Sequence, residues 1–384
     1  MPDSEGSEWT RSWKTLSPPA QGLLLAGVFC LFFTSGLLMD IASLGGNTAT
    51  RLVANAILSG GLATTYVLIV RLGARWIIPL VAIHILIASQ FDKVFGHAGA
   101  PLTGDALRTR MQIDVNVTTV AIILSFVLLS QLIRTQGAKA GALRAEIKLA
   151  RDIHRRLVPR IASQIGEFEF RGVSLPSGEV GGDLIDLVET PTGWTCLVSD
   201  VSGHGVGAGL LMGMVKSAAR TQLREGASFG QLLTTINAVL YDLKNPAMFA
   251  TFAGLQRGAD EGTLQFTIAG HLPILHYRAK ASDVVEVSIA QLPLAMFPDT
   301  AFTGAEISCD KGDLFLLLTD GLPEVFERPD ASGEEFGLDR VKSLLLEQAI
   351  AGASLDAIEH QLLAAVRGHG AQIDDQTLFL VRRG

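Results

Sequence analysis

Hydrophobic residues follow two different patterns along this chain, and the change of pattern divides it into two parts. Near the N-terminal end, long apolar runs without charge occupy residues 23–39, 52–70 and 115–133. Each run is close to the roughly 20 residues that an α-helix needs to cross a bilayer core. The first run lacks a clear small-residue cleavage site and is followed by further runs, so it is not expected to be a cleaved signal peptide. We predict an all-α transmembrane domain over residues 21–135, after a tail of residues 1–20.

A fourth, shorter run at residues 76–89 contains Pro79. It is expected either to span the bilayer or to be re-entrant or buried among the other helices. Counting it as a span gives about four helices and puts both ends of the domain on one side. On that side lie Arg11, Lys14, Arg71, Arg75, Arg134, Lys139 and Arg144, and on the other side lie Arg51, Lys93, Arg108 and Arg110. The positive-inside rule then predicts a multi-pass protein of the inner (cytoplasmic) membrane, with its C-terminal part in the cytoplasm.

A few ionisable residues lie within or beside these runs. His84 is inside the shorter run, where an ionisable group is usually functional or paired. We favour a packed, neutral imidazole over a sensing role. Asp40, Asp92, Asp105 and Asp114 lie at the edges of runs or in loops and are expected to be solvated. No motif in this part of the chain identifies a ligand.

The next segment, residues 138–158, is rich in Ala, Leu, Arg and Lys and has no proline before Pro159. This composition predicts a juxtamembrane linker helix over residues 136–160. Its apolar positions alternate in spacings of three and four: Ala140, Leu143, Ile147, Ala150, His154 and Leu157. The stripe fits a short parallel coiled coil, and hence a homodimer. It fits equally an amphipathic helix that packs on its own domain.

After Pro159, short strand-like runs are interrupted by glycine, and helical patterns also occur. The helical patterns lie near residues 206–225, 229–243, 338–350 and 354–367. Strands and helices arrive in blocks rather than in strict alternation, which favours a layered α+β or sandwich architecture over a parallel, doubly wound sheet. We therefore predict one α+β domain over residues 161–384.

Charge separates the two parts as well. Residues 1–140 carry 10 Lys and Arg against 7 Asp and Glu, whereas residues 161–384 carry 15 against 29. The acidic domain is therefore not expected to bind nucleic acid through a basic face. Cys30, Cys196 and Cys309 are far apart and form no C-x-x-C motif. They are expected to be small, buried apolar residues in a reducing compartment.

Four aspartates in the acidic domain are the best indication of its chemistry. Each lies in a glycine-rich or acidic turn: Asp183 in GGD, Asp200 in SDVSGHG, Asp320 in TDG and Asp374 in DDQT. Each turn adjoins an apolar, strand-like run, so several strand ends can bring the carboxylates to one point. Converging carboxylates need cations, and Mg²⁺ and Mn²⁺ prefer oxygen ligands. The pattern therefore predicts metal-assisted chemistry.

Six segments of the domain follow one another in a recognisable order. They are GGDLID, SDVSGHGVGAGLLM, AGHLPIL, GDLFLLLTDGLPEVF, EEFGLDRV and DDQTLFLV. Together they resemble the successive motifs of the SpoIIE-type branch of the PPM metal-dependent protein serine/threonine phosphatases, over about residues 145–383. The resemblance implies a PPM-phosphatase-like β-sandwich flanked by helices, and a phosphoprotein hydrolase in bacterial signalling.

The resemblance also implies a centre of two Mn²⁺ or Mg²⁺ ions on one rim of the sandwich. By motif position, Asp200 bridges both ions, Val201 contributes its backbone carbonyl oxygen, Asp183 holds one ion, and Asp320 and Asp374 hold the other. Asp375, Gly182, Gly203 and Gly321 are expected to support these ligands. The implied reaction is direct attack of a metal-bound hydroxide on phosphoserine or phosphothreonine.

The chain departs from the family pattern in some places. After GGD it has Leu and Ile where relatives often have aromatic residues, which predicts a change in packing. No arginine matches the phosphate-clamping residue of the wider superfamily. His204 and His271 lie at motif positions that we expect to be structural. Asp186 and Glu324 adjoin ligand motifs and are expected to hydrogen-bond nearby backbone rather than to orient metal-bound water.

These features predict a membrane-anchored phosphatase. The substrate that the resemblance implies is a phosphorylated regulatory protein, namely a STAS-type anti-sigma-factor antagonist. One alternative is a catalytically silent membrane receptor whose PPM-like domain binds partners. Another is a sensor histidine kinase that uses His154 as phosphoacceptor, although such a kinase needs an asparagine-bearing helix for Mg-ATP and the sequence shows none.

Overall fold

The computed structural model describes residues 16–70, 76–190, 193–257, 262–328 and 333–384. It divides into two compact units, the N-terminal unit (Met1–Arg144) and the C-terminal unit (Ala145–Gly384). Some residues used to predict the membrane orientation lie outside the described residues: Arg11, Lys14, Arg71 and Arg75. Most of the predicted tail, residues 1–20, lies outside them as well.

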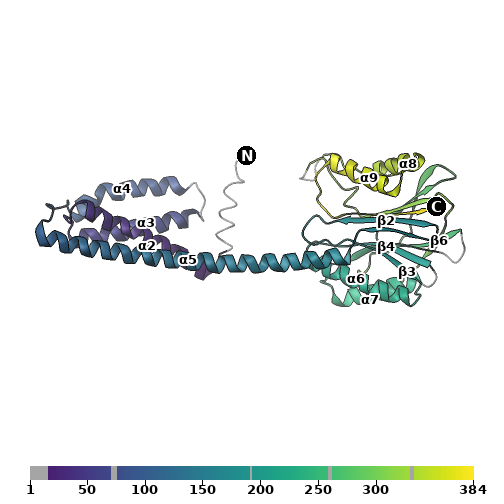
Figure 1. Cartoon of the computed structure of the whole chain (residues 1–384), viewed down its shortest axis with the longest axis horizontal. Helices are drawn as coiled ribbons and strands as arrows, with labels where there is room; N and C mark the ends of the chain where they lie inside the picture. Colours follow the sequence, from purple (N-terminus) through teal and green to yellow (C-terminus); the bar gives the residue numbers. More distant parts are fainter. Residues whose placement is uncertain (1–15, 71–75, 191–192, 258–261, 329–332) are drawn as a thin grey trace. The chain divides into compact units, whose positions relative to one another are not determined.

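The described part of the N-terminal unit is helical (Figure 1). Its helices are α2 (Pro18–Ala42), α3 (Ala49–Val70), α4 (Ile77–Phe95) and the first part of α5 (Gly104–Leu157). By length and composition, all four are candidate membrane spans. The shorter predicted run is part of α4, in which Pro79 lies in the first turn. A proline is tolerated there because the N–H groups of the first turn have no intrahelical partner.

Small residues let the helices of this unit approach closely. A Cβ added at Gly36 of α2 would lie 2.4 Å from the backbone nitrogen of Ala56 on α3. Ser125 of α5 donates a hydrogen bond of 2.8 Å to the carbonyl oxygen of Gly27 on α2. Close backbone approach at small residues, with hydrogen bonds between helices, is how helices associate in a bilayer.

Two of the aspartates that were expected to be solvated are buried instead. Asp40 on α2 has an exposed fraction of 0%, and Asp114 on α5 has one of 1%. Arg110 Nε donates to Asp40 Oδ2 at 2.8 Å and lies 3.7 Å from Asp114 Oδ2. The prediction of solvation was therefore wrong for these two residues. A guanidinium offsets the cost of burying a carboxylate, and for Asp40 it comes from another helix, whereas Asp114 lies on α5 together with Arg110.

The C-terminal unit contains two antiparallel sheets. The six-stranded sheet has the order β1 (Ile161–Ile165), β2 (Phe168–Leu175), β11 (Gln376–Arg383), β10 (Leu314–Leu318), β7 (Ile274–Arg278) and β8 (Asp283–Val287). The five-stranded sheet has the order β3 (Leu184–Thr190), β4 (Gly193–Val201), β5 (Ala250–Arg257), β6 (Thr263–Ala269) and β9 (Ala305–Ser308). Strand β2 contacts β3, and β11 contacts both β3 and β4, so the two sheets face one another.

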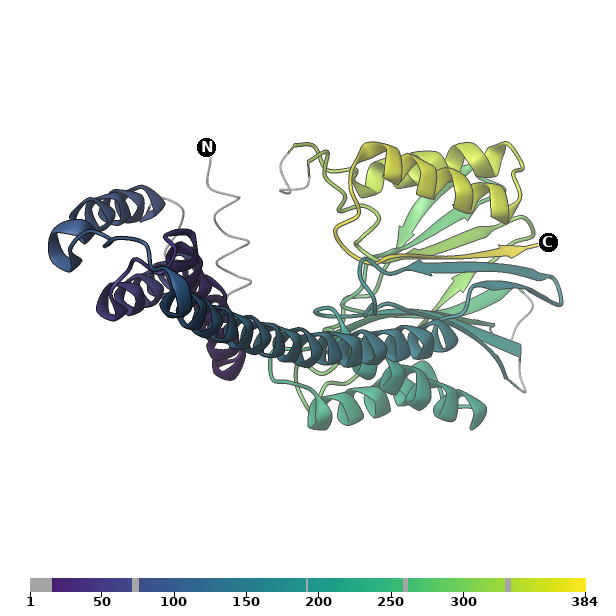
Figure 2. The same cartoon turned by 60° about the vertical axis from the view of Figure 1, so that its left-hand side comes forward.

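Helices cover the outer faces of this sandwich (Figure 2). α6 (Val206–Arg224) and α7 (Phe229–Leu243) lie on the five-stranded sheet, and α8 (Leu338–Ile350) and α9 (Leu355–His369) lie on the six-stranded sheet. Their positions match the helical patterns predicted from the sequence. The predicted fold class, a β-sandwich flanked by helices and preceded by a helical region, is confirmed.

Aromatic side chains fill the space between the sheets. Phe168 and Phe170 point inward from β2 on either side of Glu169, which is exposed, as the period-two geometry of a strand requires. Their ring centroids lie 4.9 Å and 4.8 Å from that of Trp194 on β4. Burying each such side chain stabilises the fold by roughly 1.5–3 kcal/mol. This core thus fixes the position of one sheet relative to the other, and with it the positions of the loops at their ends.

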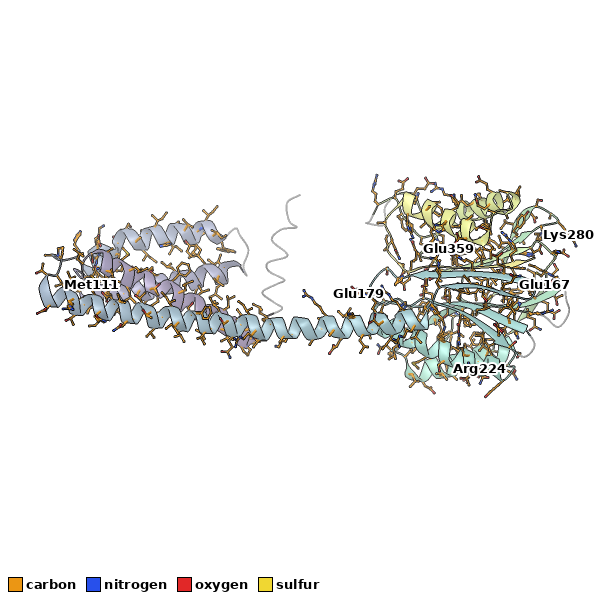
Figure 3. The ribbon with its side chains drawn as sticks, viewed as in Figure 1. Met111, Glu167, Glu179, Arg224, Lys280 and Glu359 are labelled. Atoms are coloured by element: carbon orange, nitrogen blue, oxygen red, sulfur yellow. The ribbon has the colours of Figure 1, made fainter. Side chains whose placement is uncertain are left out.

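The end of α5, residues 145–157, belongs to the C-terminal unit. Leu157 packs against the core of that unit, and the exposed fraction of His154 is 5%. Arg151 forms an ion pair with Glu179. Glu179 lies in the loop before β3 (Figure 3). His154 and Leu157, the last two positions of the predicted apolar stripe, therefore pack on the chain's own domain. For the earlier positions of the stripe, the coiled coil stays a prediction. A buried imidazole is also inaccessible to a phosphoryl donor, which argues against the histidine-kinase alternative.

Candidate active site

The four aspartates lie at strand ends in both sheets. Asp183 immediately precedes β3 and Asp200 lies near the end of β4. Leu184 pairs with Ser199, so Asp183 and Asp200 are neighbours across these two strands. Asp320 and Asp374 flank β10 and β11 at the end where Leu318 pairs with Leu378.

A side-chain hydrogen bond joins the two sheets at this end. Thr319, which follows β10, donates from Oγ1 to Asp183 Oδ2 at 2.8 Å. Its own backbone N–H donates to the carbonyl oxygen of Thr377 on β11 at 3.1 Å. The exposed fraction of Asp183 is 1%. Burial raises the pKa of Asp183 well above its ordinary value, and the negative charge of Asp200 raises it further.

The other carboxylates also affect one another. Burial, followed by the negative charges of Asp320 and Asp374, raises the pKa of Asp200 to about 7. Burial and the charge of Asp374 raise the pKa of Asp320. Like charges at short range disfavour ionisation. These four side chains therefore form one electrostatic group, although they come from separate parts of the sequence.

Two glycines allow the loops at this end to pass close to one another. A Cβ added at Gly182 would lie 2.6 Å from the carbonyl oxygen of Val201, and one added at Gly321 would lie 2.1 Å from that of Asp375. Such distances are far below van der Waals contact, so larger residues would displace the loops that carry Asp183 and Asp320. Gly203 has φ 94°, which a side chain would strain.

Asp375 has both carboxylate oxygens engaged in holding the loop before β3. Its Oδ1 accepts a hydrogen bond of 2.7 Å from the backbone N–H of Ser177, and its Oδ2 accepts one of 2.7 Å from that of Gly182. The sequence predicted a supporting position for Asp375. The structure gives that position a physical function, because Asp375 ties the GGD loop to the start of β11.

A divalent cation fits the chemistry of this group of donors. Within the described residues, no Lys, Arg or His forms an ion pair with Asp183, Asp200, Asp320 or Asp374. The described residues also contain no group of three or more His, Cys, Asp or Glu side chains already disposed to hold an ion. Carboxylates that repel one another and lack any cationic partner suit hard ions such as Mg²⁺ and Mn²⁺. The chemistry of these donors therefore fits such an ion, and their assignment as its ligands is a proposal.

Asp186, which adjoins the GGD motif, has a different environment. Lys216 Nζ lies 2.8 Å from Asp186 Oδ1, and Arg220 Nε lies 2.7 Å from Asp186 Oδ2. The backbone N–H of Leu187 also donates to Asp186 Oδ1, at 3.1 Å. Sequence reasoning missed both cations, although their spacing of four residues places them on one face of α6. Asp186 therefore fastens α6 to β3.

Two histidines lie in the motifs. Thr251, whose register partner is Asp200, has its Oγ1 2.6 Å from His271 Nδ1. Burial lowers the pKa of His271 to about 4, so the ring is neutral at physiological pH. A neutral ring that contacts a strand residue agrees with the structural position expected for His271. His204 is exposed in the glycine turn.

The cysteines offer no nucleophile. Cys196 and Cys309 are buried, as expected from the sequence, and Cys30 is half-buried. Burial raises the pKa of Cys196, and burial with the nearby charge of Asp313 raises that of Cys309 to about 12. The thiolate form, which is the reactive one, is therefore suppressed at both positions in the C-terminal unit.

Similar structures have been solved. A structure of the RsbU and RsbW domains of a Mycobacterium tuberculosis protein matches with a TM-score of 0.51 and 25% identity, over 59% of this chain and 62% of that one. The SiaA-PP2C domain of Pseudomonas aeruginosa matches with a TM-score of 0.55 and 20% identity, over 64% of this chain and 98% of the domain. The second likeness shows the fold alone.

Sequence relatives agree with this fold. Phosphoserine phosphatase RsbU of Bacillus subtilis (strain 168) is 23% identical over 248 residues, which cover 63% of this chain and 71% of RsbU. Protein IcfG of Synechocystis sp. is 26% identical over 298 residues, which cover 67% of this chain and 45% of IcfG.

The fold and these relatives define a PPM-type protein serine/threonine phosphatase, a metal-dependent class of enzyme that acts in signalling. A family model described as Stage II sporulation protein E (SpoIIE) matches residues 190–384, which are more than half of the 384 residues. The chain belongs to the SpoIIE family.

Proposed function

We propose that this protein is a membrane-anchored phosphatase that uses two Mn²⁺ or Mg²⁺ ions to hydrolyse phosphoserine or phosphothreonine on a regulatory protein. The observation that carries the proposal is the group of four carboxylates at one end of a PPM-type sandwich, where no cationic side chain of the described residues pairs with them. Protons or cations from solution can offset such charges, and among cations the hard divalent ions are those that carboxylate oxygens favour.

Asp183, Asp200, Asp320 and Asp374 would hold the ions, together with the backbone carbonyl oxygen of Val201. Bound there, two divalent ions supply Lewis-acid activation of a water molecule and of the phosphate ester. The chain's own residues orient the donors. Thr319 holds Asp183 by its hydrogen bond of 2.8 Å. Asp375 holds the backbone of Gly182, beside which the Val201 carbonyl oxygen lies.

The substrate belongs to the proposal as well. We infer a phosphorylated regulatory protein, and specifically a STAS-type anti-sigma-factor antagonist. The name of the relative RsbU, a phosphoserine phosphatase, supports the phosphoserine chemistry. The STAS-type partner rests on the family resemblance of the six motifs. Because residues 161–384 carry 15 basic against 29 acidic side chains, basic groups on such a substrate would favour its approach.

We further propose insertion into the inner membrane, with the C-terminal unit in the cytoplasm, and a homodimer. Four candidate spans support insertion. Arg134, Lys139 and Arg144 follow the last apolar run, which supports the orientation. Leu143, a position of the predicted apolar stripe on α5, has an exposed fraction of 58%, so this side chain is available to a second copy.

A phosphatase assay on the full chain in lipid nanodiscs tests the proposal. We expect Mn²⁺-dependent release of phosphate from phosphoserine peptides, and expect a chelator to abolish it. Asp200→Asn and Asp320→Asn should each lower the rate by more than about 100-fold, because each removes a charge that faces the ions. Asp310→Asn is the matched control, since Asp310 forms an exposed ion pair with Lys280.

Two results would contradict the proposed reaction. One is turnover that survives the chelator. The other is an absence of both turnover and metal affinity in well-folded, Mn²⁺-loaded protein, which would favour the silent, partner-binding receptor instead. Equal losses in Asp310→Asn and Asp200→Asn would show that the substitutions act through the fold and not through the proposed ligands.

A further inference from the structure

A pocket of about 490 Å³ lies within the N-terminal unit, between α3 and α4, with Met39 and Ser43 contributed from the end of α2. Its lining is mixed. Amide, hydroxyl, imidazole and ion-paired groups share it with a methionine, two leucines and a phenylalanine. Pockets of this volume with a few polar groups among apolar walls are typical of small-molecule sites.

The polar groups of the pocket are regularly placed. Asn47, Arg51, Asn55 and Ser59 follow one another at intervals of four residues and all line the pocket. Residues four apart lie on the same face of a helix, so α3 and the turn before it present a polar stripe to the pocket. Polar side chains in an otherwise apolar membrane helix are costly and usually mark a functional site. The stripe therefore needs a partner other than lipid.

The charges in the pocket compensate each other. Arg51 Nη2 lies 2.7 Å from Asp92 Oδ1 on α4, and Arg51 Nε donates to Asn47 Oδ1 at 2.8 Å. The guanidinium also lies over the ring of Phe91, 5.2 Å from its centroid. Arg51 is thus fully engaged, and no other Lys, Arg, Asp or Glu lines the pocket. A charged ligand would meet no free countercharge there, and in apolar surroundings that is costly.

Other polar groups in the pocket keep hydrogen-bonding capacity that the described residues do not use. The Asn55 amide donates only to the thioether of Met39, at 3.1 Å. Among the described residues, neither the Asn55 amide oxygen nor the Ser59 hydroxyl takes part in a side-chain hydrogen bond. His84, at the exposed rim, contacts Tyr66 Oη through Nδ1 at 3.3 Å. These groups offer donors and acceptors to a ligand without offering it a charge.

We propose that this pocket binds a small, uncharged amphiphile whose head carries carbonyl or hydroxyl oxygens. The head hydrogen-bonds to Asn55, Ser59 and His84. The apolar part packs against Leu58, Leu62 and Phe91. The site is separate from the phosphatase centre, and its test measures binding rather than turnover. It rests on the proposed membrane insertion, which the reconstitution step tests separately.

The experiment uses the full chain in nanodiscs and three probes that share a decyl tail. Decylubiquinone has an uncharged head with carbonyl oxygens, undecanoate has an anionic head and decyltrimethylammonium has a cationic one. Equilibrium binding is corrected for uptake by empty nanodiscs. We expect saturable binding of decylubiquinone, and binding of both charged probes at least tenfold weaker. Tighter binding of either charged probe, or uptake of decylubiquinone that never saturates, would overturn the proposal.

Paired variants locate the site. Asn55→Leu combined with Ser59→Ala should weaken decylubiquinone binding at least tenfold. Asn116→Leu is the matched control and should leave binding unchanged, because Asn116 is exposed on α5 and does not line this pocket. Equal binding by the double variant and the control would refute the assignment. If the double variant does not fold, His84→Phe decides instead: a loss of at least threefold supports the site, and unchanged binding refutes it.

The two ways of failing are distinguishable. A chain that does not enter nanodiscs contradicts the membrane insertion under the proposed function. A chain that inserts, and releases phosphate as proposed, but binds no probe contradicts this inference alone.

Discussion

Thr319 donates a hydrogen bond of 2.8 Å to Asp183 across the two sheets of the sandwich. Thr319 follows β10 and Asp183 precedes β3, so this contact joins the two halves of the proposed metal centre. Asp183 is buried, and its carboxylate orientation is determined by the groups that donate to it. The contact therefore predicts that Thr319 positions the Asp183 carboxylate, a function that the sequence motifs did not reveal.

Thr319→Val should remove that hydrogen bond while keeping the volume of the side chain. We expect the affinity for Mn²⁺ to fall about tenfold, and the free energy of unfolding to fall by roughly 1 kcal/mol. Thr319→Ser retains the hydroxyl and should restore most of the metal affinity. A titration of activity with Mn²⁺ measures the effect. Identical titration curves for the valine variant and the wild type would refute this positioning.

Gly182→Ala adds only one methyl group, but it should lower the phosphatase activity strongly. The added Cβ would lie 2.6 Å from the Val201 carbonyl oxygen, so the GGD loop must move and carry Asp183 with it. We expect activity to fall more than about tenfold. Gly178→Ala is the control, because an added Cβ there meets nothing within 4 Å. Equal activity of the two variants in the phosphatase assay would count against the role of this close approach.

The stability of the metal-free protein should depend on pH through Asp200. Its pKa rises from the ordinary value of 3.8 to about 7 in the folded state, so the folded state binds the proton more tightly than the unfolded state. The free energy of unfolding should therefore fall as pH rises from about 4 to about 7, by on the order of 2 kcal/mol. Metal binding should reverse this loss at neutral pH.

Thermal unfolding at pH 5.5 and pH 7.5, with chelator present, measures this dependence. Asp200→Asn lacks the titrating group and should show a smaller difference between the two pH values. Burial lowers the pKa of His154, which makes its own contribution opposite in sign. That contribution is lost as pH falls below about 6.5. It is common to both proteins and cancels in the comparison, so equal pH dependence in the two proteins would contradict the assignment to Asp200.

The contact of Asp186 with α6 should be important for stability. Asp186 and Lys216 have side-chain exposed fractions of 3% and 10%, so Asp186→Ala leaves an ammonium group buried without this partner. We expect a loss of roughly 3–5 kcal/mol. Replacing both residues by leucine should recover much of it. Asp310→Ala, which breaks an exposed pair with Lys280, should cost at most about 1 kcal/mol. Chemical denaturation of all three variants tests the ordering.

The end of α5 should control activity. Because His154 and Leu157 pack into the C-terminal unit, a fragment that begins at residue 160 loses part of its own packing surface. We expect its maximal rate to differ several-fold from that of a fragment beginning at residue 138, with a smaller change in metal affinity. Thermal unfolding of both fragments is the control. Equal rates would contradict control through this helix.

Local pattern was enough to predict the elements. The helical patterns near 206–225 and 354–367 became α6 and α9 because amphipathic periodicity is a property of neighbouring residues. The same holds for the apolar runs of the N-terminal unit. The turns that carry Asp183, Asp200, Asp320 and Asp374 were visible because glycine and acidic residues punctuate strand-like runs. Their assignment as metal ligands remains a prediction.

Tertiary structure alone decided which side chains meet. Thr319 and Asp183 are 136 positions apart, and Asp375 reaches the backbone of Gly182 across 193 positions. Asp40 likewise finds Arg110 across 70 positions, which is why its burial was not foreseen. Periodicity within one segment says which face of it is buried, but not which distant segment covers that face. The sequence therefore determined the elements and the kind of chemistry, whereas packing between elements determined the partners of each carboxylate.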